Sequence, residues 1–249
     1  MDHLPTQTLR EIHARKSVRA YLENQTVSAE TKELLFDAAI AAPTAGCMCL
    51  YTILDITDAA VKRELAVLCD NQSFIAKAPV VLVFLADWQR WHDSFVIATH
   101  AQTRTPDAGD LMLAAADALI AAQNVVAAAE SLGLGSCYIG DVLERQEDIA
   151  ALLHIPKYAV PVAMLCIGYP TQQQKERLKP ERFPRKYIVH ENSYQTADEA
   201  ALRRMFSERN EKRPFDSEAP AMAARKWDSP FMSEMTRSVR EWIRRFCGQ

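Results

Sequence analysis

The stretch from Leu111 to Ser131 constrains the fold most, because it is apolar on almost every side of a helix. Its polar residues are confined to one narrow stripe made of Asp117, Gln123, Asn124, Glu130 and Ser131. A helix of this kind lies at the centre of a protein, and its many alanines let neighbours approach the backbone closely. We therefore predict a central helix over 111–131 that is capped by Asp110. The polar groups argue against a membrane span.

A cluster of glycines follows this helix. The chain has only 7 glycines, and Gly133, Gly135 and Gly140 fall close together directly after it. Glycine is favoured where the chain turns or where another group approaches the backbone. We expect Gly133 and Gly135 to end the helix and turn the chain. A dinucleotide-binding loop is not expected, because Tyr138 stands where its third glycine belongs and the helix precedes the strand.

The remaining pattern alternates strands and helices. Ser28 and Asp58 are expected to cap helices, the second of which runs to Leu68. Strands are predicted over 51–56, 79–86, 136–139 and 160–168, and a further helix over 144–153. This alternation indicates helices covering a sheet, in an α/β or α+β layer. From about Lys175 the chain turns basic and irregular, until a closing helix over about 232–246 that packs either on its own subunit or on another surface.

Bulk properties exclude several classes of protein. A net charge of -3 argues against a general nucleic-acid binder. The cysteines show no paired framework, which is typical of free thiols in a reducing compartment. The N-terminus lacks the apolar core of a secretory signal, so we expect a cytoplasmic protein.

Three short motifs carry candidate chemistry. In the basic run from Arg15 to Arg19, extended backbone would place Arg15, Ser17 and Arg19 on one side, where they suit a phosphate or an electron-rich carbonyl. Lys179 and Arg182 flank a proline and form a second candidate clamp, and the run 43–46 offers backbone groups in a turn. The alternative is a solvated basic surface and a plain helix stop. No nucleophile–base motif or metal-ligand spacing appears, so we expect a cofactor to supply any chemistry.

In this order, the motifs resemble the nitroreductase family of flavoenzymes. They are most similar to its branch of NADPH-dependent flavin reductases and oxygen-insensitive nitroreductases with a C-terminal extension. The resemblance spans roughly residues 9–195 and rests on Arg15-x-Ser17-x-Arg19, Ala42-Pro43-Thr44-Ala45, Gln72, Ala122-Gln123-Asn124, 128–135, Tyr138-Ile139-Gly140, Lys179 with Arg182, and 189–194.

The resemblance implies an α+β sandwich with a central mixed or antiparallel sheet flanked by helices. It implies a homodimer with FMN sites at the interface and the long helix at the dimer core. Residues 1–195 would form the FMN-binding domain, and residues 196–249 an extension packed on the same or the partner subunit. No nucleic acid or membrane partner is expected.

The same resemblance implies roles for individual residues. Gln72 would hydrogen-bond the flavin ring, with a backbone N–H of the 140–141 segment near its N5. The other cofactor-binding residues would be Arg15, Lys16, Ser17, Arg19, Thr44, Ala45, Gly46, Tyr138, Ile139, Gly140, Asp141, Lys179 and Arg182. Of these, Thr44, Ala45 and Gly46 would come from the partner subunit. Charge alone points to Arg209, Lys212 and Arg213 as a site for the 2′-phosphate of NADPH.

The implied function is hydride transfer from NADPH or NADH through flavin N5 to nitroaromatics, quinones or free flavin, by a ping-pong mechanism. The alternatives are a reductase specialised for one metabolite, or a flavin-binding sensor or storage protein. The chain departs from the family pattern at Asp141, at Cys47 and Met48, and at Glu181, an extra residue before Arg182. Asp141 stands where the branch often has a second glycine, and a carboxylate there would disfavour anionic flavin unless it points away. Cys47 is expected to be a small buried residue, with an exposed thiol beside the flavin as the alternative.

Overall fold

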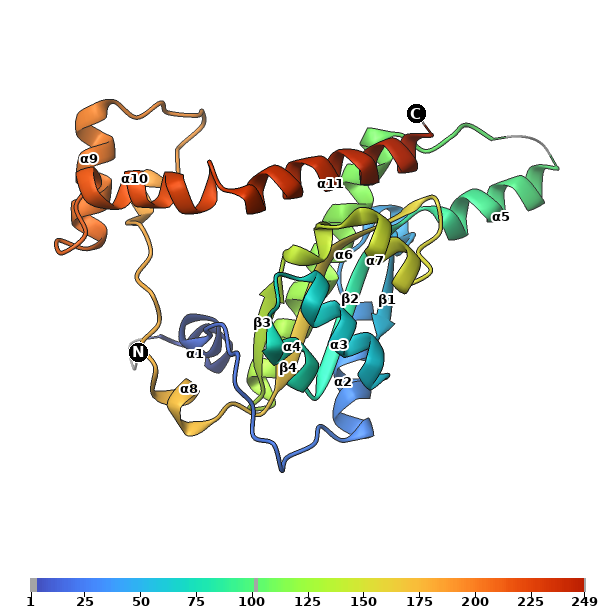
Figure 1. Ribbon diagram of the computed structural model, residues 1–249, viewed down its shortest axis with the longest axis horizontal. Helices are drawn as coiled ribbons and strands as arrows, with labels where there is room; N and C mark the ends of the chain where they lie inside the picture. Colours follow the sequence, from blue (N-terminus) through green and yellow to red (C-terminus); the bar gives the residue numbers. More distant parts are fainter. Residues whose placement is uncertain (1–3, 101–102, 249) are drawn as a thin grey trace. The chain divides into compact units, whose positions relative to one another are not determined.

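A computed structural model describes residues 4–100 and 103–248 of the chain (Figure 1). Its contacts divide into two units. One unit comprises the residues up to Arg177 together with those from Met235 onward, and the other comprises Leu178–Glu234. Residues 1–3, part of the segment from which we expect no secretory signal, lie outside the described range.

The first unit is built on a four-stranded sheet. Its order is β1-β2-β4-β3, and each neighbouring pair is antiparallel. The strands are β1 (Tyr51–Asp55), β2 (Val80–Asp87), β3 (Gly135–Ile139) and β4 (Ala159–Gly168). The four predicted strands are thereby confirmed to within about two residues at their ends. Both long strands, β2 and β4, lie in the interior of the sheet, which explains their continuous apolar sequences.

Helices surround this sheet. Those of the first unit, with their short 3₁₀ turns, are α1 (Gln7–Ala14), α2 (Ala29–Ile40), η1 (Ala45–Cys47), α3 (Ala59–Leu68), α4 (Ser73–Lys77), α5 (Gln89–Thr99), α6 (Ala108–Ser131), η2 (Asp141–Leu143), α7 (Gln146–Leu152) and α8 (Gln172–Glu176). The caps predicted at Ser28 and Asp58 are confirmed, since the side chains accept from Thr31 N and from Ala60 N and Val61 N.

Residues of β2 alternate between two hydrophobic cores. Val81, Val83 and Leu85 pack into the core that also holds residues of α3 and α7, while Leu82 and Phe84 pack into the core shared with α2 and α6. Both faces of the sheet are therefore covered, and the predicted α+β sandwich is confirmed.

The long helix α6 lies on the second face and begins earlier than predicted. Asp107, not Asp110, is its N-cap, and Asp110 occupies the third helical position of a capping box. The Asp110 carboxylate accepts from Asp107 N at 2.9 Å. Aspartate is a favoured residue at the N-cap, and the prediction placed the cap at Asp110 instead of at Asp107. By length and apolarity α6 is the one helix of the described ranges that could cross a membrane. It instead packs against β2 and β4 with Asp117 buried.

The second unit is helical where an irregular chain was expected. It contains η3 (Arg185–Tyr187), α9 (Glu199–Arg209), α10 (Phe215–Lys226) and the start of α11 (Pro230–Cys247). Neither α9 nor α10 has a buried residue, so neither presents an apolar face to a hydrophobic core. The closing helix is confirmed as α11, and its residues from Met235 onward belong to the first unit.

Candidate functional site

The basic run that follows α1 lies along the edge of the sheet beside β3. Ser17 forms a parallel bridge with Ser136, and Val18 N donates to Ser136 O at 2.9 Å. Val18 is buried whereas Arg19 is exposed, so the side chains alternate at these two positions, while Arg15, Lys16 and Ser17 are all half-buried. Burial raises the pKa of the neighbouring Cys137 thiol, and the charges of Arg19 and Arg15 act against this rise.

Two cations, one within this run and one outside it, donate hydrogen bonds to backbone carbonyls. Lys16 Nζ donates to Lys175 O at 2.6 Å and also to Arg177 O. Arg177 in turn donates from its guanidinium to Ser17 O. Arg177 could not be found from the sequence, because it belongs to no motif and lies far from Ser17 along the chain. Together these bonds hold Ser17 in place between Arg15 and Arg19.

Each glycine of the run after α6 has a different role. Gly133 has a φ of +73° and ends the helix, with Leu134 N donating to Ala129 O at 2.8 Å. Gly135 does not turn the chain, which corrects our expectation. A Cβ on Gly135 would come within 2.5 Å of Val18 Cγ2, so the missing side chain is what allows the basic run to lie against β3. A Cβ on Gly140 would meet nothing within 4 Å.

Two further predicted residues precede Gly140 on β3. The Ile139 side chain is buried in the core, so only its backbone is available to a ligand. Tyr138 is half-buried, and its hydroxyl lies 3.4 Å from Gln123 Oε1 on α6. Burial raises the pKa of Tyr138 to about 12, while the charge of Arg15 acts in the opposite direction. Tyr138 is therefore a neutral residue close to Arg15.

Gln72 and Asp141 contact one another directly. Gln72 precedes α4, and its Nε2 donates to the carboxylate of Asp141, the first residue of η2. The same Nε2 also donates to Cys69 O at 3.0 Å. The Asp141 side chain thus points toward the residue that was predicted to bind the ring. The structure brings Gln72, Asp141 and the open backbone of Gly140 together at the C-terminal end of β3.

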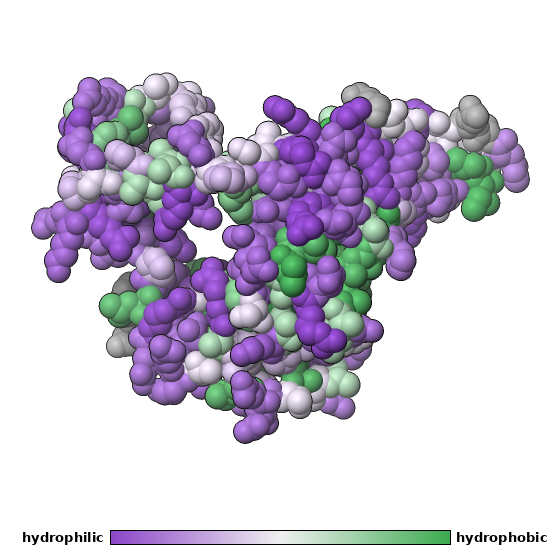
Figure 2. Space-filling view, viewed as in Figure 1, coloured by the Kyte–Doolittle hydropathy of each residue, from purple (hydrophilic) through white to green (hydrophobic). Residues whose placement is uncertain are grey.

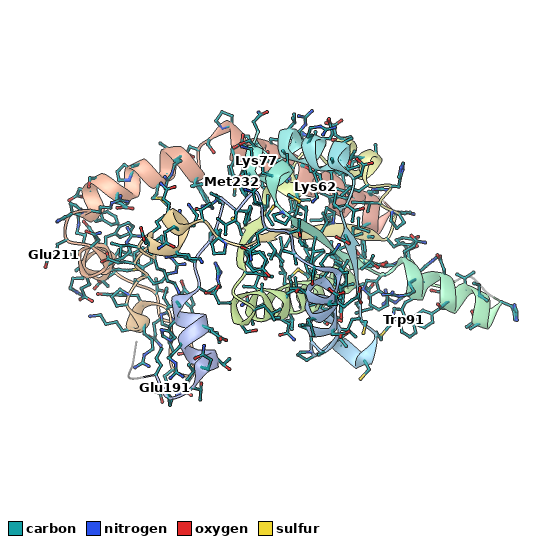
Figure 3. All side chains as sticks on the ribbon, turned by 90° about the horizontal axis from the view of Figure 1, so that it is seen from below. Lys62, Lys77, Trp91, Glu191, Glu211 and Met232 are labelled. Carbon is teal, nitrogen blue, oxygen red and sulfur yellow. The ribbon has the colours of Figure 1, made fainter. Side chains whose placement is uncertain are left out.

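The Thr44–Gly46 segment is held by a buried carboxylate. Asp117 on α6, 4% exposed, accepts hydrogen bonds from Thr44 Oγ1, from Ala45 N at 2.9 Å and from Leu50 N at 3.2 Å. In the sequence, Asp117 stands out only as part of the polar stripe of this helix, and its role in holding the loop was not predicted. Helix α5 adds support, since Trp91 Nε1 donates to Met48 O at 2.7 Å (Trp91 is labelled in Figure 3). The loop from Thr44 to Leu50 is therefore anchored to two helices.

Cys47 lies at the surface of this loop. Its side chain is exposed and its backbone φ is +56°. The expectation of a small buried residue is wrong, because the left-handed backbone of Gly46 and Cys47 turns the loop outward. The six cysteines are free thiols.

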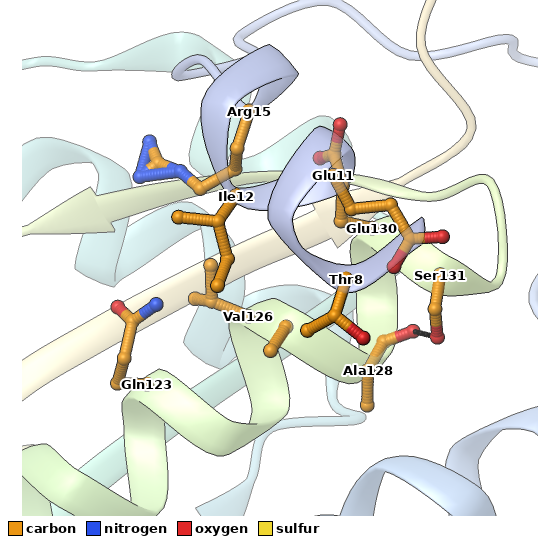
Figure 4. Close-up of a pocket in the computed structure, with 10 residues that line it drawn as sticks. Thr8, Glu11, Ile12, Arg15, Gln123, Val126, Ala128, Glu130 and Ser131 are labelled. Atoms are coloured by element: carbon orange, nitrogen blue, oxygen red, sulfur yellow. Dashed lines mark hydrogen bonds between the residues drawn. The ribbon is translucent and has the colours of Figure 1, made fainter. Parts of the chain in front are cut away.

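Two hollows adjoin the basic run. One, of about 260 Å³, lies between α1 and α6, where Arg15 and Gln123 line it beside Ile12 and Val126 (Figure 4). The other, of about 660 Å³, lies beside Arg19, with Phe74 and Lys77 in its wall. Arg19 also stands 6.0 Å from the centre of the Phe74 ring. The two guanidinium groups thus border separate openings on either side of Ser17.

The other predicted cations belong to the second unit. Lys179 and Arg182 are exposed, and Arg182 donates to Pro180 O at 3.4 Å. Arg209 is stacked over Phe183 at 4.3 Å and pairs with Glu218 at 3.0 Å. The Arg213 guanidinium lies 3.7 Å from Glu218, with its side chain 69% exposed. Arg213 is therefore more accessible to a ligand than Arg209, while Lys212 N donates to Asn210 Oδ1 at 3.0 Å.

Known proteins resemble this chain over most of its length. It is 34% identical over 197 residues to an oxygen-insensitive NADPH nitroreductase of Salmonella typhimurium, covering 79% of this chain and 78% of the relative. It is 33% identical to an FMN reductase (NADPH) of Bacillus subtilis, covering 75% and 74%. The solved NADPH:FMN oxidoreductase of Vibrio harveyi, complexed with NAD+, superposes with a TM-score of 0.77 at 25% identity, covering 94% and 98% of the two chains. The model of the nitroreductase family matches residues 12–169, and the chain belongs to that family.

Proposed function

We propose that this protein is an FMN-dependent oxidoreductase that takes hydride from NADPH or NADH and passes it to nitroaromatics, quinones or free flavin in a ping-pong sequence. One observation carries the proposal. The Arg15–Arg19 run lies against β3, and at the end of the same strand Gly140 leaves open space beside Gln72 and Asp141. A cationic run beside a strand and a bare backbone at the end of that strand suit a ligand that is anionic at one end and flat at the other.

The residues at this site fit FMN. Arg15 and Arg19 would hold its phosphate and the pyrimidine side. Because a Cβ at Gly140 would meet nothing within 4 Å, a planar ring has room against that backbone. When bound, FMN supplies the centre that accepts and releases hydride. The protein's part is to bind and orient, and N–H donors or cations aimed at the pyrimidine edge stabilise the charge that develops there.

We also propose a homodimer in which the Thr44–Gly46 segment completes the partner's flavin site. Its support is apolar surface that a single chain leaves exposed. On α6, Met112 is 71% exposed and Leu113 52%, and on α5 Ile97 is 71% exposed. The outer end of α5 is visible as an apolar patch in Figure 2. Exposed apolar surface of this kind marks protein interfaces. A cytoplasmic location fits the free thiols.

The experiment that tests the function is FMN binding followed by anaerobic reduction. The purified protein should be yellow, or become yellow with added FMN, and NADPH should bleach it within a stopped-flow trace. A colourless protein that takes up no FMN would overturn the proposal. A yellow protein that NADPH does not bleach would instead support the sensor or storage alternative.

Gly140→Ala is expected to separate flavin binding from stability. The φ of Gly140 is -82°, which suits any residue, and its surroundings are open. The free energy of unfolding should therefore be unchanged or raised by about 0.4–1 kcal/mol. The added methyl would occupy the space proposed for the ring and cost about 1–3 kcal/mol of FMN binding. Gly109→Ala, also in open space but at the start of α6, is the matched control and should leave FMN affinity unchanged. Equal FMN affinities for both variants would contradict the proposed ring position.

Arg213→Ala is expected to raise the KM for NADPH about tenfold and to leave that for NADH unchanged. Loss of a charge-assisted hydrogen bond to the 2′-phosphate accounts for this size. Arg213 is the better position to test, because the stacked Arg209 helps to build its own unit. Steady-state kinetics with both nucleotides measure the effect. An equal rise for NADPH and NADH would rule out the phosphate contact.

A further inference from the structure

The Gln72 side chain has a fixed orientation in this protein. Its Nε2 donates to Cys69 O at 3.0 Å and to the Asp141 carboxylate. A carbonyl and a carboxylate can only accept hydrogen bonds, so both contacts must be made by the amide nitrogen. The positions of the amide oxygen and nitrogen are therefore set by chemistry. Both N–H groups are used, and Oε1 is the atom of this amide that is left to meet a ligand.

Asp141 is itself held in place. Glu144 N donates to its carbonyl at 3.0 Å, and η2 continues into the segment that α11 fastens through Ser238. Its carboxylate also lies near Cys69, whose pKa is raised to about 12 by burial first and then by the charge of Asp141. Three groups thus meet at one point: the Cys69 carbonyl, the Gln72 amide and the Asp141 carboxylate. The open backbone of Gly140 directly precedes Asp141 in the chain.

We propose that Asp141 is a positioning residue that turns the Gln72 amide so that Oε1 accepts a hydrogen bond from the N3–H of the flavin ring. This inference rests on the proposed FMN binding. The pyrimidine edge of a flavin carries one donor, N3–H, between two carbonyl acceptors. An amide free to rotate would meet either kind of group, whereas Asp141, together with the Cys69 carbonyl, commits Gln72 to the donor. Asp141, which departs from the family pattern, would therefore determine which group of the pyrimidine edge Gln72 contacts.

The test compares FMN with N3-methyl-FMN, which lacks the N3–H, in the full-length chain stripped of flavin and titrated with each. Wild type should bind FMN about tenfold more tightly than the analogue, the size of one well-made hydrogen bond. In Asp141→Ala this ratio should fall to about twofold or less, because the single bond to the Cys69 carbonyl then holds the Gln72 amide less firmly. In Asp141→Asn the ratio should be retained, because the asparagine carbonyl still accepts from Gln72 Nε2.

Asp148→Ala removes an exposed carboxylate on α7 and serves as the control, with the wild-type ratio expected. Thermal unfolding of each variant checks that it is folded. If Asp141→Ala keeps the wild-type ratio, or if wild type binds both flavins equally, the positioning role is overturned while FMN binding stands. If wild type binds neither flavin, the proposed function fails, and the inference fails with it. Rescue by Asn and not by Ala distinguishes orientation through the hydrogen bond from an effect of charge.

Discussion

Asp117→Ala is expected to lower the free energy of unfolding by about 3–4 kcal/mol. The wild-type carboxylate is 4% exposed and accepts from Thr44 Oγ1, Ala45 N and Leu50 N. Alanine removes the common acceptor of all three donors and leaves a small void beneath the loop. Two of these donors are backbone N–H groups that are costly to leave unsatisfied. Denaturant unfolding at fixed protein concentration measures the change.

Two variants sharpen this prediction. Asp117→Asn keeps the shape but turns an NH₂ toward the donors, so we expect an intermediate loss. Asn124 lies seven residues further along α6 and donates a single bond to Ala38 O at 3.1 Å. Asn124→Ala is therefore the matched control, with an expected loss of about 1 kcal/mol. Equal free energies of unfolding for Asp117→Ala and Asn124→Ala would mean that the bonds from the 44–50 loop to Asp117 stabilise the protein no more than the single bond of Asn124.

Asp117 also tests the role proposed for the loop. If Thr44–Gly46 completes the flavin site of the partner, releasing the loop should weaken FMN binding in protein that is still folded. A flavin titration well below the unfolding midpoint measures this separately from stability. Unchanged FMN affinity in a destabilised but folded variant would mean that the loop makes no contribution to the site.

Asp117 shows why the helix could be predicted from the sequence while the role of this carboxylate could not. The polar stripe of α6 is a local pattern, and it predicted the central helix well. The partners of Asp117 lie about seventy residues earlier in the chain, and no periodicity within a helix identifies them. Gly135 is similar. Its position after a helix pointed to a turn, whereas its actual neighbour is Val18, which only the folded chain brings to β3.

Long elements with a buried face were predicted, whereas several helices without one were missed. Strand β2 is buried along its whole length, and its ends were predicted to within one residue. Helix α5 was missed, and like α9 and α10 it has no buried residue, so packing imposes no apolar period on its sequence. The basic run was predicted because alternation in an extended segment is also local. The contacts that fix it, from Arg177 and Val18, depend on the tertiary fold.

Trp242→Ala is expected to lower the free energy of unfolding by about 3–5 kcal/mol, the usual cost of truncating a large buried aromatic side chain. Trp242 on α11 is 1% exposed, and its Nε1 donates to Leu143 O at 3.2 Å. Ser238, one turn earlier, donates to the same carbonyl at 2.7 Å. Trp242→Phe keeps one six-membered ring but loses the hydrogen bond and part of the buried indole, so its expected cost is about 2 kcal/mol. Thermal and denaturant unfolding compare the two variants.

This prediction also connects the C-terminal helix to the site. Leu143 is the last residue of η2, whose first residue is Asp141, so the α11 contacts fasten the short turn that carries this carboxylate. Trp242→Ala should therefore loosen η2 and weaken FMN binding even where the protein is folded, whereas Trp242→Phe should retain near-normal affinity. If Trp242→Ala is destabilised but binds FMN normally, η2 keeps its position without α11. If it is as stable as wild type, the packing of α11 on this unit contributes little to the fold.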